Sequence, residues 1–447
     1  MFGTGEMFAL LAIMLLMVFA GVHVAVALGA GAVAGIYMMH GDIHVVRTFI
    51  AGTAYEALRD YVFAVIPLFM LMGDFLAKCG AARDLFALIN RLARRLPGRL
   101  AIATVLANAV FAFVTGVSIA AAAAFSRIAY PEMKRYGYER KFALGCIAGS
   151  ACLGMLIPPS VLMIVWSVLT EQAIGKIFIA GILPGFVLVA FYCAYILGVA
   201  WLQPQRVGAG VRAAGTPPDP EMTDAEFREV LISTLLVLLL VAATLGGIWL
   251  GFFTPTEGAG VGAAFALLLA MWKGMRAKAL FEVVLSVGRT SAPLLVLLFC
   301  AQLYSRVLSM TGLTSAAKEL FISSGLGPFG VLAIMVAIWF VLGCLIDSIS
   351  IILLTVPVFA PVAMALGFDP LAFAILGILA IETGLLTPPF GILVFTVKAA
   401  VPREGTVGEI FRGAIPYWIA LLGVIVVIAT FPEIATWLPA VGTTLAK

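Results

Sequence analysis

Two pairs of adjacent prolines constrain the fold of this chain more than any other feature of its sequence. Pro158-Pro159 and Pro388-Pro389 each interrupt a long apolar segment, and they lie 230 positions apart. Because proline has no backbone N–H and cannot continue the hydrogen-bond ladder of a helix, each pair predicts a broken helix. The same offset aligns further residues of the two halves, which predicts an internal duplication: Ser118 with Ser348, Ile119 with Ile349, Pro131 with Pro361, Gly137 with Gly367 and Gly154 with Gly384.

The composition indicates that these helices lie in a membrane. Hydrophobic residues make up 63% of the chain and charged residues only 11%, whereas soluble domains carry roughly 25% charged residues. A membrane-spanning helix needs about 20 apolar residues, and the chain offers about ten such stretches. The short alternating segments of a membrane barrel do not occur. The sequence therefore predicts an all-α polytopic membrane protein.

One polar stretch predicts how the chain is divided. Residues 203–229, rich in proline, glycine and charge, have the composition of a surface linker. Residues 1–202 then form the first repeat and residues 230–447 the second. Each repeat is predicted to hold scaffold helices, a hairpin and a broken helix, with the hairpins at about 98–135 and 328–366 and the broken helices at about 139–169 and 370–398.

The first apolar run is too long to be one straight membrane-spanning helix. From Met7 to Met39 it would reach about 50 Å as a single helix. The matching run of the second half is interrupted at Thr254-Pro255-Thr256. By analogy, we expect a break near Gly21-Val22-His23 and two short helices in the first half.

Basic residues indicate which loops face the cytoplasm. The loop 78–99 holds six basic residues and the loop 132–141 holds four, so the positive-inside rule places both in the cytoplasm. Only residues 100–129 separate these loops, with a break at Thr115-Gly116-Val117-Ser118 that leaves each arm short for a membrane span. This pattern predicts a re-entrant hairpin, which is tolerated only where its backbone is buried in protein or lines a wet cavity.

The equivalent segment of the second half predicts the opposite orientation. Residues 329–365 break at Asp347-Ser348 and have few charged residues at their flanks, whereas the preceding residues 273–289 carry four basic residues. The second hairpin is therefore expected to enter from the outer side, which makes the duplication an inverted repeat. A parallel repeat of ordinary full spans is the alternative.

The two hairpin tips and the two broken helices predict two sodium sites near the middle of the membrane. Broken helices free backbone carbonyls, and these together with Ser and Thr hydroxyls provide oxygen ligands for Na⁺. The alternative to sodium coordination is that each hydroxyl donates only to the backbone carbonyl four residues earlier and bends the helix. The first predicted site consists of Thr115, Gly116, Ser118, Gly154 and Pro158, and the second of Asp347, Ser348, Ser350, Gly384, Thr387 and Pro388.

Ionisable residues inside apolar stretches are costly to bury and are functional by default. Asp347 and Glu382 are therefore candidates for cation coordination or proton carriage, with structural pairing as the alternative. Ser160 and Gly391 follow the double prolines, where the N-terminus of a half-helix suits a carboxylate substrate. Together with Glu382, these two residues form the predicted set for substrate or proton contact.

Other polar residues have simpler expected roles. Glu257 follows the turn at Pro255, and we expect it to cap the helix that begins there. Arg306 is a possible contact for a substrate anion, although a side chain that extends to the membrane interface is the better interpretation. The six cysteines are scattered singly, so we expect neither disulfides nor a metal site from them.

With these motifs, the chain resembles the large membrane subunit of TRAP (tripartite ATP-independent periplasmic) transporters, the DctM-like proteins. One departure is Val117, which stands where the hairpin tips of the family often have the first of two serines. The motifs that carry the resemblance are Ile66-Pro67-Leu68-Phe69, Gly116-Val117-Ser118-Ile119-Ala120-Ala121, Pro131-Glu132-Met133, Ile157-Pro158-Pro159-Ser160, Thr254-Pro255-Thr256-Glu257, Gly343-Cys344-Leu345-Ile346-Asp347-Ser348 and Thr387-Pro388-Pro389-Phe390-Gly391.

The resemblance implies an elevator-type ion-transporter fold and a Na⁺-coupled importer with an elevator mechanism, placed as a multi-pass protein in the bacterial inner membrane. It implies two protein partners, a small four-helix membrane subunit and a periplasmic substrate-binding protein. The implied substrate is an organic acid that carries a carboxylate, such as a C4-dicarboxylate or sialic acid. No GxxxxGK[ST] motif is present, so ATP is not expected to drive transport.

Other classes of function fit the sequence less well. A stand-alone ion-coupled anion carrier, which needs no binding protein, and an ion channel are the alternatives to a TRAP subunit. A membrane enzyme is disfavoured because Ser118 and Ser348 have no basic residue nearby in sequence to activate them. The expected surroundings are the lipid bilayer and membrane partners, with no nucleic acid.

Overall fold

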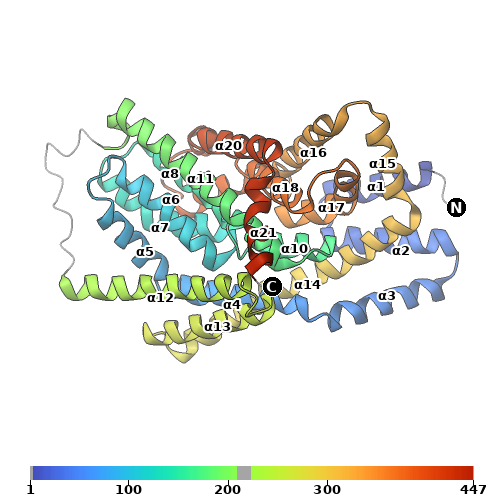
Figure 1. The fold of residues 1–447 in the computed structure, drawn as a ribbon, viewed down its shortest axis with the longest axis horizontal. Coiled ribbons are helices and arrows are strands. Elements are labelled where there is room, and N and C mark those ends of the chain that lie inside the picture. The colour runs from blue at the N-terminus through green and yellow to red at the C-terminus, as the bar shows by residue number, and fades with distance from the viewer. Residues whose placement is uncertain (1–3, 209–222, 446–447) are drawn as a thin grey trace.

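The structure is a computed structural model that describes residues 4–208 and 223–445 (Figure 1). Within those ranges it consists of helices joined by turns, together with one isolated bridge between Tyr138 and Val207. Seven of the described helical segments are long and apolar enough to cross a membrane. The chain is therefore a multi-pass helical membrane protein, as the composition predicted.

The helices follow one another along the chain in two series. Residues 4–206 form α1 (Thr4–Phe19), α2 (Val24–His40), α3 (Ile43–Arg59), the 3₁₀ helix η1 (Tyr61–Ala64), α4 (Val65–Lys78), α5 (Ala81–Leu92), α6 (Arg99–Thr115), α7 (Ser118–Arg135), α8 (Arg140–Ala151), α9 (Leu153–Leu156), α10 (Val161–Thr170), α11 (Ile174–Leu202) and η2 (Pro204–Arg206). Residues 224–445 form α12 (Asp224–Trp249), α13 (Pro255–Trp272), α14 (Ala277–Thr311), α15 (Leu313–Ser323), α16 (Gly327–Gly343), α17 (Ser348–Ala365), α18 (Pro370–Gly384), α19 (Ile392–Ala400), α20 (Val407–Thr430) and α21 (Glu433–Leu445).

The helix boundaries of the two series match closely at the offset of the double prolines. Helices α7 and α17 correspond at both ends, and α6, α8 and α10 correspond to α16, α18 and α19 within a few residues. One exception is α14, which runs unbroken for 35 residues where the first half has α3, η1 and α4. Asp60 explains that difference, because its extended backbone ends α3 and its side chain caps η1 by accepting a hydrogen bond from Val62.

Local capping signals set several of the predicted boundaries. The expected break in the first apolar run is confirmed, since α1 ends at Phe19 and α2 begins at Val24. The expected cap at Glu257 is confirmed as well: Thr254 and Glu257 bond reciprocally in a capping box at the start of α13.

The predicted linker 203–229 is shorter than expected. Residues 209–222 of that linker lie outside the described residues. Helix α12 already begins at Asp224, because Thr223 and Glu226 form a second capping box there. Local hydrogen bonding thus extends the helix into a stretch whose composition suggested a loop.

The hairpins and broken helices interlock at the centre of the molecule. The first hairpin comprises α6 and α7, and the second comprises α16 and α17 (Figure 1). Helix α10, which follows the first double proline, packs on α17 of the second hairpin, and α19 packs in the same way on α7. Trp166 of α10 and Trp339 of α16 are fully buried, with ring centroids 5.9 Å apart. The two halves therefore form one packed unit around their breaks.

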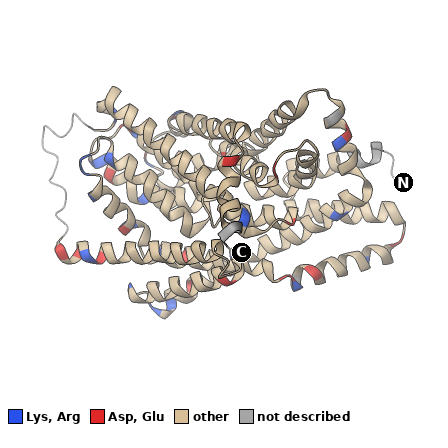
Figure 2. Ribbon diagram, in the orientation of Figure 1, with Lys and Arg blue, Asp and Glu red and all other residues tan. Residues whose placement is uncertain are grey.

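Ion pairs join loops that lie far apart in the sequence, and the first of them connects two loops with the basic residues typical of the cytoplasmic side, 78–99 and 273–289. Lys273 pairs with Asp84, Arg206 pairs with Glu139, and Lys134 pairs with Glu404. The bonds from Lys134 and from the hydroxyl of Tyr130 hold the pKa of Glu404 below its usual value. Figure 2 shows Lys and Arg at both ends of the molecule, while long stretches of the helices between them are uncharged.

Helices α8 and α20 approach each other closely through glycine. A Cβ atom added to Gly145 would lie 2.2 Å from the carbonyl carbon of Gly413, and one added to Gly413 would lie 2.1 Å from the carbonyl oxygen of Lys141. Such distances leave no room for a methyl group without a shift of backbone. The contact between these helices therefore depends on glycine at both positions.

This contact predicts a large effect for a small substitution. Gly413→Ala should destabilise the protein by about 1–3 kcal/mol, the usual cost of overpacking, and should lower its melting temperature in detergent. Gly423→Ala, on the same helix and with no atom within 4 Å of the added Cβ, is the matched control. Equal melting temperatures for the two variants would contradict the close contact.

Candidate functional site

A buried carboxylate connects the two halves at the centre of the molecule. Glu382 lies near the end of α18 and is only 1% exposed. Its Oε2 accepts a hydrogen bond from Ser118 Oγ at 2.7 Å, and its Oε1 accepts one from Ser348 Oγ at 3.3 Å. These serines are the first residues of α7 and α17, so each begins the second arm of its hairpin. One carboxylate therefore bonds to both hairpin tips.

The charge of this carboxylate has no basic partner in the described part of the chain. The ion pairs there involve other acidic residues, among them Asp84, Glu139 and Glu404. Burying an ionised carboxylate without a counter-charge is costly, so such a group binds a proton or a cation. Hydrogen bonds from two hydroxyls offset part of that cost. The centre of the molecule thus has the chemistry of a cation or proton site.

The first hairpin tip lies directly against the first double-proline break. The carbonyl of Gly116 accepts a hydrogen bond from Val161 N at 3.3 Å, and a Cβ on Gly116 would lie 2.3 Å from the carbonyl oxygen of Pro159. A Cβ on Gly154 would lie 3.1 Å from the Cα of Ser118. The structure thus brings the residues predicted for the first sodium site, including Pro158 within the break, to one place.

The second tip lies against the second break in the same way. A Cβ on Gly384 would lie 2.5 Å from the Cα of Gly343, so the two backbones touch. The hydroxyl of Thr387, which directly precedes Pro388, lies 2.9 Å from the thiol of Cys344 and donates to the carbonyl of Gly384 at 2.9 Å. The tip and the break predicted for the second sodium site are therefore neighbours.

Some of the predicted hydroxyls are already engaged locally. Thr115 donates to the carbonyl of Phe111, four residues earlier, at 3.2 Å. A bond of this kind, which only bends the helix, was the expected alternative to sodium binding for these hydroxyls. Ser118 and Ser348 differ, because their hydroxyls reach across to another helix.

The carboxylate of Asp347 accepts hydrogen bonds at the start of its own helix. Its Oδ2 accepts a hydrogen bond from Ser350 N at 3.0 Å, and its Oδ1 accepts one from Ser350 Oγ at 2.5 Å, which caps α17. Asp347 is exposed, whereas Glu382 is buried. In the first half the matching position is Val117, which makes no side-chain cap for α7. The two hairpin tips therefore differ in charge and in capping.

Ser160 and Gly391 have structural roles at the starts of their half-helices. The hydroxyl of Ser160 caps α10 by accepting a hydrogen bond from Met163 N at 3.4 Å. Gly391 has a φ of +43° and packs so closely that a Cβ would lie 2.4 Å from the ring of Phe411. In the described part of the chain, neither residue shares a hydrogen bond with Glu382.

Sequence reasoning missed the role of Cys152. Its thiol donates to the backbone carbonyl of Glu382 at 3.7 Å, and the two residues are 230 positions apart. Cys152 is thus the repeat equivalent of Glu382, and the offset of the double prolines was the signal that could have found it. The contact of Trp166 with Trp339 had no such signal, because those two residues are not equivalent under that offset.

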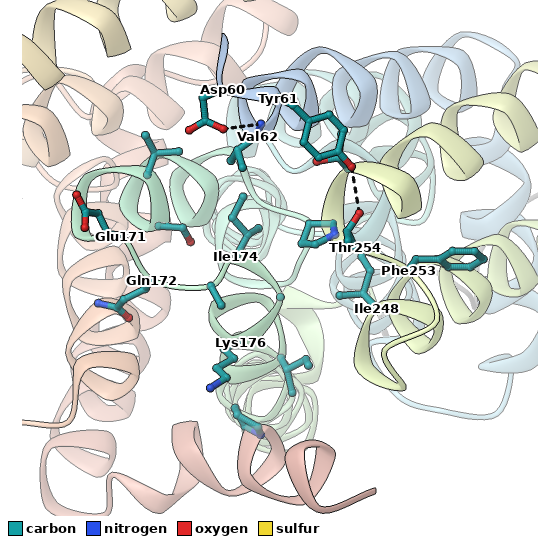
Figure 3. Close-up of a pocket in the computed structure, with 18 of the residues that line it drawn as sticks. Asp60, Tyr61, Val62, Glu171, Gln172, Ile174, Lys176, Ile248, Phe253 and Thr254 are labelled. Carbon is teal, nitrogen blue, oxygen red and sulfur yellow. Dashed lines mark hydrogen bonds between the residues drawn. The ribbon is translucent and has the colours of Figure 1, made fainter. Parts of the chain in front are cut away.

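A separate cavity of about 800 Å³ lies at the start of α11, between η1 and the turn from α12 to α13 (Figure 3). Its lining includes Lys176 and Arg306, and the hydroxyls of Tyr61 and Thr254 lie 3.2 Å apart at its edge. The guanidinium of Arg306 forms an ion pair with Glu56, so its charge is already compensated. Apart from Arg306, the described lining contains none of the residues that the sequence analysis considered for the sodium or substrate sites.

Together, these features define the class of the protein. Two broken helices and two hairpin tips surround a buried acidic residue in a multi-pass helical fold, which is the construction of a secondary transporter's central site. The chain belongs to the family described as "Tripartite ATP-independent periplasmic transporter, DctM component", whose model matches residues 11–434. The family resemblance seen in the motifs is thereby confirmed.

Individual relatives agree with this family assignment. The C4-dicarboxylate TRAP transporter large permease protein DctM of Pseudomonas aeruginosa is 33% identical, over 86% of this chain and 88% of the relative. The ectoine/5-hydroxyectoine TRAP transporter large permease protein UehC of Ruegeria pomeroyi is 30% identical, over 95% of this chain and 96% of the relative. These relatives are transport permeases, so the chain is a transporter component and not an enzyme.

A solved structure shares the fold. The crystal structure of the Alcanivorax borkumensis YdaH transporter aligns with a TM-score of 0.61, over 89% of this chain and 90% of the other. The sequence identity is 15%. The likeness therefore lies in the fold, at a low level of sequence identity.

The cap at Asp347 predicts that its two simplest substitutions differ. Asp347→Asn keeps an oxygen that accepts from Ser350 N, whereas Asp347→Ala removes the cap, which costs about 1 kcal/mol. The alanine variant should therefore melt at a lower temperature than the asparagine variant. Thermal melts of both purified variants test this, and a similar loss in both would show that the charge, rather than the cap, stabilises the tip.

Proposed function

We propose that this chain is the large membrane subunit of a Na⁺-coupled TRAP transporter in the bacterial inner membrane. It imports an organic acid that a periplasmic substrate-binding protein delivers, and it works together with a small four-helix membrane subunit. Family membership supports the transport role and the two partners. The observation that carries the ion coupling is the buried carboxylate of Glu382 between the two hairpin tips.

Sodium fits the surroundings of the two breaks. Each break combines a double proline, which frees backbone carbonyls, with a hairpin tip whose first helical residue is a serine. Hard oxygen ligands of this kind suit an alkali cation. The first Na⁺ binds around Gly116, Ser118 and Gly154, and the second around Ser348, Gly384 and Thr387.

An elevator movement accounts for the interlocked centre. Because α10 packs on α17 and α19 packs on α7, both hairpins and both broken helices move as one body. The long helices outside this centre, such as α12 and α14, form the frame against which it slides. The ion pair between Lys273 and Asp84 joins two of the basic loops predicted to be cytoplasmic, which supports an inverted repeat.

The names of the relatives support a carboxylate as the substrate. They are described as permeases for C4-dicarboxylates, for ectoine and 5-hydroxyectoine, and for sialic acid. All of these compounds carry a carboxylate group. The helix N-terminus that Ser160 caps after the first break, and the glycine at 391 after the second, offer backbone N–H groups to such an anion.

Sodium binding predicts a Na⁺-specific gain in thermal stability. Titration of the purified protein with NaCl should raise its melting temperature in proportion to the logarithm of the Na⁺ concentration once that concentration exceeds the dissociation constant, because a ligand at 100 times its dissociation constant adds about 2.7 kcal/mol. Choline chloride at equal ionic strength is the control for general salt effects. Identical curves for the two salts would exclude Na⁺ as the coupling ion.

The inverted repeat predicts which loops a membrane-impermeant thiol reagent can reach. Single cysteines at Arg95 and Arg135, both exposed, should label only from the cytoplasmic side. A cysteine at Lys318, which is exposed in the second half, should label only from the outside. The wild-type protein, which carries only the native cysteines, provides the control for background labelling. Labelling of Arg95→Cys and Arg135→Cys from opposite sides would favour the parallel repeat.

A further inference from the structure

Glu382 lies in contact with its own equivalent in the other half of the chain. Its equivalent in the first half is Cys152, and the thiol of Cys152 lies 3.7 Å from the backbone carbonyl of Glu382. Two equivalent residues that touch must lie close to the axis that relates the two halves. A side chain at either position can therefore reach both hairpin tips.

Only one acidic side chain fits at this place. A carboxylate at position 152 as well would lie beside that of Glu382, and two like charges so close in a buried site cannot both be ionised. The chain has an acid at one of the two positions and a thiol, which is small and uncharged, at the other. The single carboxylate then serves Ser118 with one oxygen and Ser348 with the other.

We propose that Glu382 is a positioning residue shared by both sodium sites, so that the two sites fill cooperatively. Each serine belongs to one hairpin tip, and each tip forms one side of one predicted site. An ion that draws Ser118 into place also fixes the carboxylate, and the fixed carboxylate holds Ser348. This inference rests on the proposed function, because it concerns the ions that drive transport.

The coupling between the two sodium sites depends on the hydrogen bonds to Glu382 and not on its charge alone. Within the described residues, the Ser118 and Ser348 hydroxyls meet no shared side chain other than Glu382. A glutamine at position 382 keeps an oxygen that accepts one hydrogen bond and an N–H₂ that donates to the other hydroxyl. Glu382→Gln therefore keeps both tips connected, whereas Glu382→Ala disconnects them.

The test is the steepness of equilibrium binding of radioactive Na⁺ to the purified chain at one fixed temperature, with choline chloride as the balancing salt. Wild type should give a Hill coefficient clearly above 1, towards the limit of about 2 for two sites. Glu382→Ala and Ser118→Ala should each lower it to about 1, and Glu382→Gln should keep the steepness at a higher half-saturating concentration. Ser126→Ala is the matched control, since this buried serine of α7 bonds only to the carbonyl of Ala122, at 2.7 Å.

An exchange of the two equivalent residues gives the sharper test. Glu382→Cys should lose the steep response, and the double variant Cys152→Glu with Glu382→Cys should regain it, because the carboxylate again lies between the tips. If the two positions had only a structural role, the exchange of Cys152 and Glu382 would not restore the steep response. Size-exclusion profiles of each variant establish that it is folded before the titration is interpreted.

The outcomes separate this inference from the function on which it rests. A wild-type protein whose melting temperature does not respond to Na⁺ would overturn the proposed coupling ion itself. A wild-type binding curve whose steepness survives in Glu382→Ala, or that the exchanged double variant fails to restore, would overturn the shared role of Glu382 and leave two independent sodium sites.

Discussion

The arrangement at the centre of this protein depends on one buried carboxylate held by two hydroxyls. An acid in an apolar interior is tolerated only if hydrogen bonds and a bound cation or proton compensate its charge. Ser118 and Ser348 supply the hydrogen bonds, and each can do so only while its hairpin tip stays at the centre. The hydrogen bonds that compensate the buried charge of Glu382 thus fix the position of two hairpin tips that lie far apart in the sequence.

The irregular backbone around this carboxylate is shielded by close packing. Broken helices leave peptide groups without partners, and such groups are stable inside a membrane only when protein covers them. Glycine allows that cover to come close: Gly116 lies against Pro159, and Gly343 lies against Gly384. The crossing of α10 onto α17, and of α19 onto α7, then surrounds both breaks with helices from both halves. Helix breaks that favour ion binding are therefore compatible with a stable fold.

Local rules made much of this structure predictable from sequence. The double prolines, the capping pair at Thr254 and Glu257 and the early break before Val24 all depend on residues close together in the chain. The hydrogen-bond partners of Glu382 could not be predicted in this way, because Ser118 lies 264 residues away in the sequence. Asp347 was placed beside Glu382 as an equal candidate, since sequence alone does not distinguish an exposed cap from a buried acid. The membrane class and the family followed from composition and motifs, whereas the sodium sites remain predictions.

The two halves differ in one stretch, although their helix boundaries otherwise match at the offset of the double prolines. Helix α14 is continuous over 35 residues, or about 52 Å, while the corresponding stretch of the first half bends at Asp60 through the short helix η1. Pro293 lies inside α14 at the position that corresponds to Phe63 of η1, and it removes one backbone hydrogen bond there. Both halves are therefore weakened at the same place, by a change of helix type in the first half and by a proline in the second. A matching stretch of two different sequences thus has the same weak point by two different local means.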